Sequence, residues 1–398
     1  MESLWQRHAS RILCLAIGLT LLSVMLRTLP GLHRLLFVEH PRGATDLLLR
    51  YAELQRWFAG APVYGGTIYA AYPPASYMLL FPFIGWVDET AARWIWCILS
   101  IVELALLSRW TIKMTRTTAR LEKAVILLTF FSAYPITLTL GSGQLGIHIL
   151  ALILGALLLS RSGSGWLADL GTGALLVFAA AKPSFGAPLY FVFLFAVGRL
   201  RPVLIAVCGY GLLTALALSF QSSPPGQMLG DYYGKSTEVI NAFGGAHIAR
   251  WMHIMGWGKW TSLASIALFL ALGLWIYRNR HADVWILLGV SAVIARVWTY
   301  HAPYDDQLIF LAMIPLLRWL RQDGMEERLK LPAACLLAFA WLAMFMPART
   351  LYFPWPWNLP YHAGLPILWG LMLILLVRVA RFEHISQMAE NSRLSAKM

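Results

Sequence analysis

The chain has 398 residues, of which 59% are hydrophobic and only 13% are charged, and its mean hydropathy is +0.63. A soluble domain carries about 25% charged residues, so this composition excludes an ordinary soluble globular protein. The net charge of +13 does not by itself indicate a nucleic-acid partner, because Lys and Arg also collect at the cytoplasmic ends of membrane-spanning helices. We therefore predict an all-α polytopic integral membrane protein that binds no nucleic acid.

The first apolar run, residues 10–27, follows MESLWQRHASR, which has the charge pattern of a signal sequence. No small-residue cleavage site follows it, so we interpret this run as a retained first span. The next segment predicts an amphipathic helix at the membrane interface, with Thr45 as its N-cap and Asp46 in its first turn. Asp46 either complements the helix dipole or belongs to a functional site. The apolar stripe of this helix consists of Leu47, Leu48, Tyr51, Leu54, Trp57 and Phe58.

Tyr72-Pro73-Pro74 predicts a rigid turn that leads into the short, proline-rich apolar run 73–87. We interpret that run as re-entrant or interfacial rather than as a crossing. The other apolar runs predict about twelve transmembrane helices in a single membrane-embedded domain, 1–398, with both termini on the same side. The predicted crossings are 10–27, 90–112, 124–140, 144–160, 166–181, 184–198, 203–220, 260–277, 283–300, 307–321, 331–347 and 363–380.

The positions of the basic residues orient these predicted crossings. Most of the 32 Lys and Arg residues fall near the two termini or in short connections such as 109–123, which places both termini in the cytoplasm. The longer loops 28–89, 221–259 and 348–362 then lie on the outer face of an inner or plasma membrane. The cytoplasmic connections are too short to form a pocket, so we expect the functional site at the outer face.

Three further polar groups lie at the outer ends of predicted spans. The turn at 141–144 carries Gln144, whose amide offers donors and acceptors at membrane depth, although a plain turn is the simpler interpretation. Lys182 lies between two apolar runs, where a lysine snorkels, finds a partner or binds an anion such as phosphate. The cluster HAPYDD at 301–306 follows Arg296, and its paired carboxylates are costly at the edge of a helix bundle unless they are solvated or form a site.

An early Asp in the first outer loop, then Tyr-Pro-Pro, Gly-Gln and Lys-Pro, resembles glycosyltransferase family 87, the membrane-embedded polyprenol-phosphate-sugar-dependent transferases of the GT-C class. The resemblance covers residues 10–200 and, more loosely, the cluster at 301–306. It implies a GT-C-like helix bundle in which the catalytic base falls on Asp46. Leu145-Gly146, directly after the Gly-Gln pair, departs from the family pattern.

The resemblance further implies transfer of a hexose or pentose from a polyprenyl-phosphate donor to a lipid or glycan acceptor, with inversion of the anomeric carbon. The leaving lipid phosphate needs positive charge. No carboxylate–histidine grouping has metal-ligand spacing, so we expect fixed cations and no cofactor, while a divalent metal stays open. The expected donor-phosphate or substrate ligands are Lys182, His301, Arg296, Gln144, Tyr72, Asp305 and Asp306.

Two other functions remain as alternatives. A transporter or flippase of a lipid-linked or anionic solute would also have many spans, but its polar groups should lie at mid-membrane and its halves should show internal symmetry. A polysaccharide ligase or polymerase would use the same kind of donor, and the basic residues of loop 221–259 fit that function.

Overall fold

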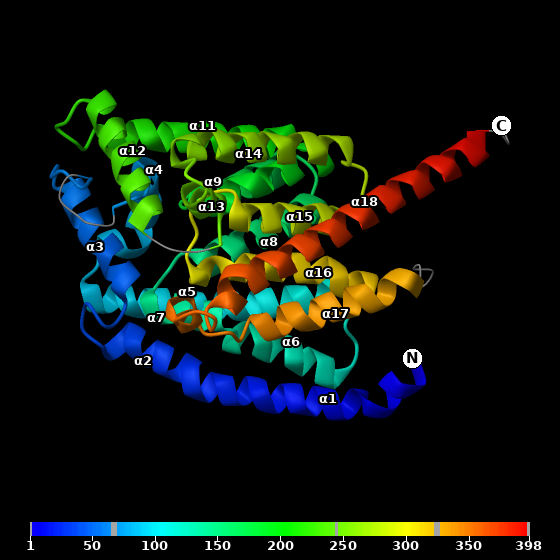
Figure 1. Cartoon of the computed structure of the whole chain (residues 1–398). Coiled ribbons are helices and arrows are strands. Elements are labelled where there is room, and N and C mark those ends of the chain that lie inside the picture. The colour runs from blue at the N-terminus through cyan, green and yellow to red at the C-terminus, as the bar shows by residue number, and fades with distance from the viewer. Residues whose placement is uncertain (1, 65–69, 243–245, 322–326, 396–398) are drawn as a thin grey trace. The chain divides into compact units, whose positions relative to one another are not determined.

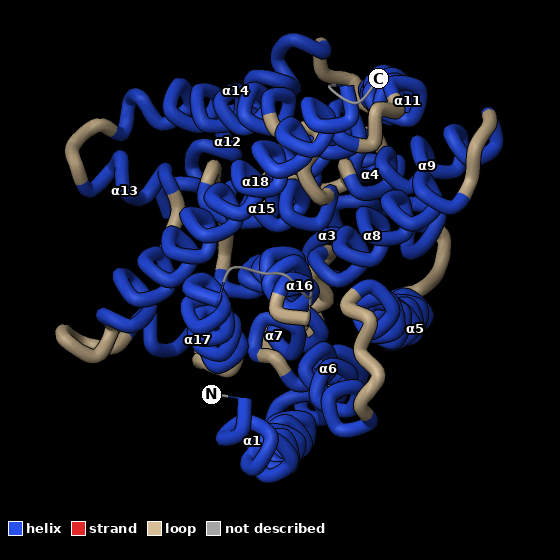
Figure 2. The backbone as a smooth tube through the Cα atoms, turned by 90° about the vertical axis from the view of Figure 1, so that its right-hand side faces the viewer, coloured by secondary structure: helices blue, strands red, loops and turns tan. Residues whose placement is uncertain are grey.

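The computed structural model describes residues 2–64, 70–242, 246–321 and 327–395. These residues form helices, short 3₁₀ and π segments, and loops, with no strand among them (Figure 2). The all-α class expected from the sequence is confirmed. The chain divides into two compact units, one comprising Met1–Leu154, Phe178–Lys182 and Cys208–Val239, the other Gly155–Val177, Pro183–Val207 and Ile240–Met398.

The first unit is built around packed helix pairs. Within it α1 lies alongside α6, α2 alongside α7, and α5 also packs on α6 (Figure 1). These helices are α1 (Glu2–Ser23), α2 (Leu29–Phe37), α3 (Thr45–Phe58), α4 (Pro74–Leu80), α5 (Glu89–Met114), α6 (Arg120–Ser132), α7 (Tyr134–Ser142) and the first half of α8 (Gly146–Ser162). Most of α11 (Leu200–Leu218) and of α12 (Pro225–Ala242) completes the unit.

The second unit is organised around α15, which packs against α14, α16 and α18. Almost all of α15 is buried, because its apolar side chains are in contact with helices on several sides. Its helices are the end of α8, most of α9 (Trp166–Ala179), α10 (Pro183–Gly186), the start of α11, α13 (Ile248–Ile254), α14 (Thr261–Arg278), α15 (Val284–Val297), α16 (Ile309–Trp319), α17 (Glu327–Ala343) and α18 (Leu365–Ser395).

Five helical stretches of the described residues are long and apolar enough to cross a membrane. They are His8–Phe37, Glu89–Met114, Leu200–Leu218, Gly258–Arg278 and Pro360–Arg381. Two broken pairs would raise the total to seven, namely Arg120–Ser132 with Tyr134–Ser142, bent by 41°, and Trp166–Ala179 with Pro183–Ala196, bent by 120°. The prediction of twelve crossings stays a prediction, since several of its spans correspond to helices of 10–17 residues or to bent pairs.

Helix α3 occupies the segment that the apolar stripe predicts, and its apolar face holds it in the first unit. Leu47, Leu54 and Trp57 are fully buried, and the Trp57 indole donates a hydrogen bond to the Ala217 carbonyl oxygen at 3.1 Å. The predicted N-cap at Thr45 is wrong by one residue. Ala44 precedes the helix with φ of 50°, and its N–H donates to the Gly141 carbonyl at 3.2 Å, so a tertiary contact rather than a side-chain cap begins the helix.

Candidate active site

Three charged residues follow one face of α3, because positions i, i+4 and i+7 of a helix share a face. Asp46, in the first turn, is half-buried, whereas Arg50 and Glu53 are buried. Arg50 Nη2 lies 2.8 Å from Glu53 Oε1 in an ion pair whose side chains are 7% and 0% exposed. The Tyr77 hydroxyl donates to Glu53 Oε2 at 3.2 Å. Asp46 is thus the least buried of the three charged residues, and the other two, Arg50 and Glu53, neutralise each other.

The turn between α7 and α8 supplies the neighbours of Asp46. The side chains of Ser142 and Gln144 lie near its carboxylate and favour its charged form. Gln144 Oε1 accepts from the Tyr72 hydroxyl and from the Leu145 N–H, both at 3.2 Å, which leaves the amide nitrogen of Gln144 as its group available to donate. The carboxylate therefore has two neutral polar neighbours that favour its ionised form.

Gly143 makes the close approach of this turn to α3 possible. Its φ is 73°, in the left-handed region, and it ends α7. A Cβ at this position would lie 2.5 Å from the Cβ of Leu47. Only glycine meets both conditions without strain, so this residue brings the Gln144 amide within reach of the carboxylate in the first turn of α3.

Tyr72 contacts both the charged residues of α3 and the turn between α7 and α8. Its ring lies under the Arg50 guanidinium, with the Cζ atom 4.5 Å from the ring centroid, and its hydroxyl donates to Gln144. A guanidinium stacked on an aromatic face is held by the ring quadrupole as well as by its ion pair. Arg50 thereby fixes Tyr72, and Tyr72 fixes the amide that faces Asp46.

Lys182 lies in the same unit, in the turn between α9 and α10. It is 9% exposed, and the Ala181 carbonyl before it accepts a hydrogen bond from the Ser76 hydroxyl at 2.7 Å. This bond ties the lysine turn to the first turn of α4, directly after Tyr72-Pro73-Pro74. The ammonium group is close enough to Asp46 to favour the ionised carboxylate.

Opposing influences set the protonation of Asp46. Burial disfavours the charged form and is the largest influence, while Arg50, Ser142, Lys182 and Gln144 favour it. The net result is that the pKa of Asp46 is raised above the usual value for an aspartate. A carboxylate with a raised pKa is a stronger base when it is ionised, which is the property that proton abstraction requires.

The remaining predicted residues form a second cluster, within the second unit. Arg296 Nε lies 2.5 Å from Asp306 Oδ1, and the Arg296 guanidinium covers the Trp369 ring at 4.7 Å from its centroid. The Tyr361 hydroxyl donates to Asp306 Oδ2 at 3.3 Å. Arg296 is fully buried, and its charge is balanced within the cluster by Asp306.

The side chains of His301 and Asp305 form a second pair, separate from the pair of Arg296 and Asp306. His301 Nδ1 and Asp305 Oδ2 are 3.0 Å apart, and both side chains are fully buried. Asp305 Oδ2 also accepts from the Ala302 N–H at 3.2 Å, which fixes the carboxylate at the start of a 3₁₀ turn, Pro303–Leu308. The two aspartates thus have different partners: Asp306 pairs with Arg296 and Asp305 with His301.

A family model decides what kind of protein carries these clusters. The model for glycosyltransferase family 87 matches residues 69–319, which is more than half of the chain. The chain belongs to glycosyltransferase family 87. No curated protein and no solved structure matches it. Membership makes the protein a glycosyltransferase, and its long apolar helices make it a multi-pass membrane protein.

The matched range of this family 87 glycosyltransferase includes Tyr72, Gln144, Lys182 and the whole cluster at 301–306, but it begins after Asp46. The first unit brings Asp46, Tyr72, Gln144 and Lys182 together, although they are far apart in the sequence. Their individual roles in the transfer reaction stay predictions. Among the described residues, no group of three or more His, Cys, Asp or Glu side chains could hold a metal ion.

No role was predicted from the sequence for Arg50, Glu53 or Tyr77. The spacing of Asp46, Arg50 and Glu53 was the available signal, because it places three charged residues on one face of the helix, next to the buried apolar stripe. Charged residues at such positions are partly buried and therefore need partners. No sequence signal indicated that Tyr77 would donate to Glu53, since this contact depends on how α4 packs against α3.

Proposed function

We propose that this glycosyltransferase moves a sugar from a polyprenyl-phosphate donor to an acceptor hydroxyl at the outer face of the membrane, with Asp46 as the general base. The observation that carries the proposal is the setting of Asp46: a half-buried carboxylate with Ser142 and Gln144 as polar neighbours and with the Lys182 charge nearby. Such a group has the proton affinity, orientation and partial exposure that a base needs. Family membership favours this function over transport.

In the proposed step an acceptor hydroxyl hydrogen-bonds to the Asp46 carboxylate. The hydroxyl oxygen attacks the anomeric carbon of the donor as its proton moves to Asp46. The bond between the anomeric carbon and the phosphate oxygen breaks on the opposite side, and its electron pair leaves with the phosphate. The configuration at the anomeric carbon is inverted, and the proton on Asp46 passes to water.

The charge that develops on the leaving phosphate is best met by Lys182. It belongs to the same unit as Asp46, and it carries a point charge that suits phosphate. Arg296, proposed from the sequence for the same role, has its charge balanced by Asp306 in a fully buried pair, and His301 is paired with Asp305. We therefore keep Lys182 as the first candidate and place His301 and Arg296 behind it.

The sidedness of the site is supported by charge distribution. Lys and Arg are concentrated in the short connections and near the termini, which favours cytoplasmic termini and places the α3 segment outside. A donor whose lipid chain lies in the bilayer would present its sugar and phosphate at that boundary. We therefore propose an inner or plasma membrane protein whose active site faces outward.

Purified protein in lipid nanodiscs, incubated with a panel of polyprenyl-phosphate sugars and lipid or glycan acceptors, tests this proposal. Mass spectrometry should show one donor losing its hexose or pentose to an acceptor. Asp46→Asn should abolish the transfer, whereas Glu39→Gln, an exposed carboxylate in the same segment, should not change it. Near-normal turnover by Asp46→Asn would refute the base assignment, and turnover of a soluble nucleotide sugar instead would refute the donor class.

A further inference from the structure

Two connections of the second unit, one between α8 and α9 and the other directly before α11, meet at a surface rich in arginine. Arg199 joins them: its Nη2 donates to the Gly163 carbonyl oxygen at 2.6 Å, and its Nη1 lies 3.3 Å from Asp169 Oδ1. Arg201, in the first turn of α11, lies with its Nη1 at 4.0 Å from the other oxygen of the same carboxylate. One carboxylate therefore faces two guanidinium groups.

The arginines of this surface differ in how much of their charge is already used. Arg199 is held by its two short contacts, and its side chain is 22% exposed. The side chain of Arg201 is 78% exposed, and Arg161, at the end of α8, is exposed as well. The segments 161–170 and 198–204 contain three arginines and a single carboxylate, so the surface has a net positive charge. Two guanidinium groups remain accessible to an anion.

Large apolar side chains lie beside these arginines along the chain. Trp166 and Leu167, at the start of α9, are 65% and 68% exposed, and Leu200 and Leu204, at the start of α11, are 55% and 49% exposed. Trp is enriched where lipid headgroups meet the hydrocarbon core, and exposed Leu side chains suit acyl chains rather than water. We name these residues the arginine surface: Arg161, Trp166, Leu167, Asp169, Arg199, Leu200, Arg201 and Leu204.

The combination of charge and apolar area selects a class of ligand. Guanidinium groups match the oxygen atoms of a phosphate and can bind them in pairs. A soluble anion would contact the arginines alone, whereas a phospholipid would contact the arginines with its phosphate and the apolar side chains with its acyl chains. The distribution of Lys and Arg favours the cytoplasmic side for both connections, and anionic lipids give that leaflet a negative surface potential.

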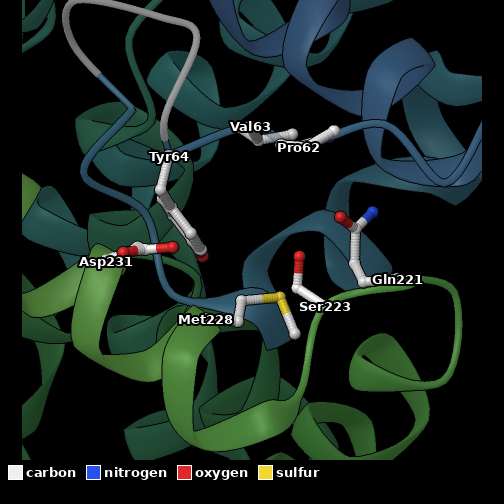
Figure 3. A pocket seen from close by; sticks show the side chains of 7 residues that line it. All are labelled: Pro62, Val63, Tyr64, Gln221, Ser223, Met228 and Asp231. Atoms are coloured by element: carbon white, nitrogen blue, oxygen red, sulfur yellow. The ribbon is translucent and has the colours of Figure 1, made fainter.

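The small hollow in the first unit does not offer an alternative lipid site. It lies between the stretch after α3 and the start of α12, and its lining includes Tyr64, Met228 and Asp231 (Figure 3). It has room for about one water molecule, and Asp231 is exposed. A phospholipid headgroup is much larger than a water molecule, so this hollow cannot hold one.

We propose that the arginine surface binds the phosphate of an anionic phospholipid in the cytoplasmic leaflet. Arg161 and Arg201 contact the phosphate, and Trp166 lies beside the glycerol and the upper acyl chain. Arg199 and Asp169 hold the two connections together and so set the spacing of these groups. The bound lipid anchors this end of the second unit at the membrane boundary. The inference goes beyond the proposed function and does not depend on it, because none of these residues belongs to the candidate active site.

Native mass spectrometry of the full-length protein in detergent, with phosphatidylglycerol or phosphatidylcholine added, tests the proposal. The first phosphatidylglycerol should bind more tightly than the first phosphatidylcholine. Arg161→Gln and Arg201→Gln should each weaken it about fivefold, and the double variant about thirtyfold, the effect of removing one or two basic residues from an anionic surface. The double variant Arg328→Gln/Arg381→Gln is the matched control, since it removes the same charge from exposed arginines of α17 and α18 and should leave the affinity unchanged. Circular dichroism checks the fold of each variant.

Two further measurements identify the bound group. Raising NaCl from about 50 to about 500 mM should weaken phosphatidylglycerol binding, because salt screens the exposed guanidinium groups. Trp166→Ala should also weaken it, because the acyl chains lose an apolar contact. Equal affinities for the two lipids, or an Arg161→Gln/Arg201→Gln variant that binds like the control variant, would overturn the inference. Inorganic phosphate that binds as tightly as phosphatidylglycerol would overturn it in favour of a soluble anion, and tighter binding of a polyglutamate peptide would assign the surface to an acidic protein.

Discussion

The buried pair of Arg50 and Glu53 gives the sharpest test of how the site is held. Arg50→Met keeps an apolar stem of similar length but removes the charge that lies 2.8 Å from Glu53. Glu53 is fully buried, so its carboxylate would lose its compensating charge in a setting that water does not reach. Breaking a buried ion pair from one side costs about 3–5 kcal/mol, mainly because of the charge left behind. We expect Arg50→Met to lower the free energy of unfolding by that amount.

Removing both charges should cost less than the two single changes together. Glu53→Gln leaves the Tyr77 hydroxyl with an acceptor, and in the double variant no buried charge lacks a partner. The free energies of unfolding of the four proteins can be measured in mixed micelles with increasing SDS, followed by tryptophan fluorescence. Arg42→Met, an exposed arginine before α3, is the control and should change stability by about 0.5 kcal/mol or less. A cost for Arg50→Met below about 1 kcal/mol, or strict additivity of the two changes, would refute the role of the pair.

The loss of stability caused by Arg50→Met should depend on pH in a definite direction. Burial raises the pKa of Glu53, although Arg50 and Tyr77 oppose the shift. Between the unfolded and folded pKa values the native protein binds more protons than the unfolded chain, so this group lowers stability as pH rises through that interval. Arg50→Met removes an opposing influence and should raise the pKa of Glu53 further. The cost of Arg50→Met should therefore be smaller near pH 5 than near pH 8, about one and four pH units above the ordinary pKa of glutamate. An equal cost at both values would contradict the electrostatic explanation.

Three further predictions concern the site directly. The acid limb of kcat/KM against pH should have its midpoint above the usual pKa of an aspartate, because activity requires ionised Asp46, whose pKa is raised by burial; a midpoint at or below the ordinary value would contradict this. Lys182→Ala should lower kcat about 10²–10³-fold by removing charge from the leaving phosphate, and it should move that midpoint upward because Lys182 favours the ionised carboxylate; unchanged donor affinity and kcat would exclude the lysine. Gly143→Ala should destabilise the protein by about 1–3 kcal/mol, since it combines a φ of 73° with a Cβ 2.5 Å from that of Leu47. Gly226→Ala, whose Cβ would meet nothing within 4 Å, is the control and should not destabilise the protein when thermal unfolding is measured.

The sequence by itself determined the class of the protein and the identity of much of the site. A hydrophobic content of 59% with 13% charged residues requires a membrane environment, because so much apolar surface cannot be covered in water. The motif order indicated family 87, and the apolar stripe from Leu47 to Phe58 predicted the helix that carries Asp46. These conclusions were accessible because composition, periodicity and motif spacing are local properties of the chain.

The tertiary structure decided which charges are paired and which side chains surround the Asp46 carboxylate. Arg50 pairs with Glu53 and stacks on Tyr72, Gln144 accepts a hydrogen bond from Tyr72, and Asp306 rather than Asp305 pairs with Arg296. The start of α3 likewise follows from the contact of Ala44 with α7 and not from a capping side chain. The contacts of Arg50 with Tyr72 and of Ala44 with Gly141 depend on segments that are far apart in the chain. Periodicity specifies which face of a helix is buried, but only the packing of that face against other segments specifies the partner that it meets there.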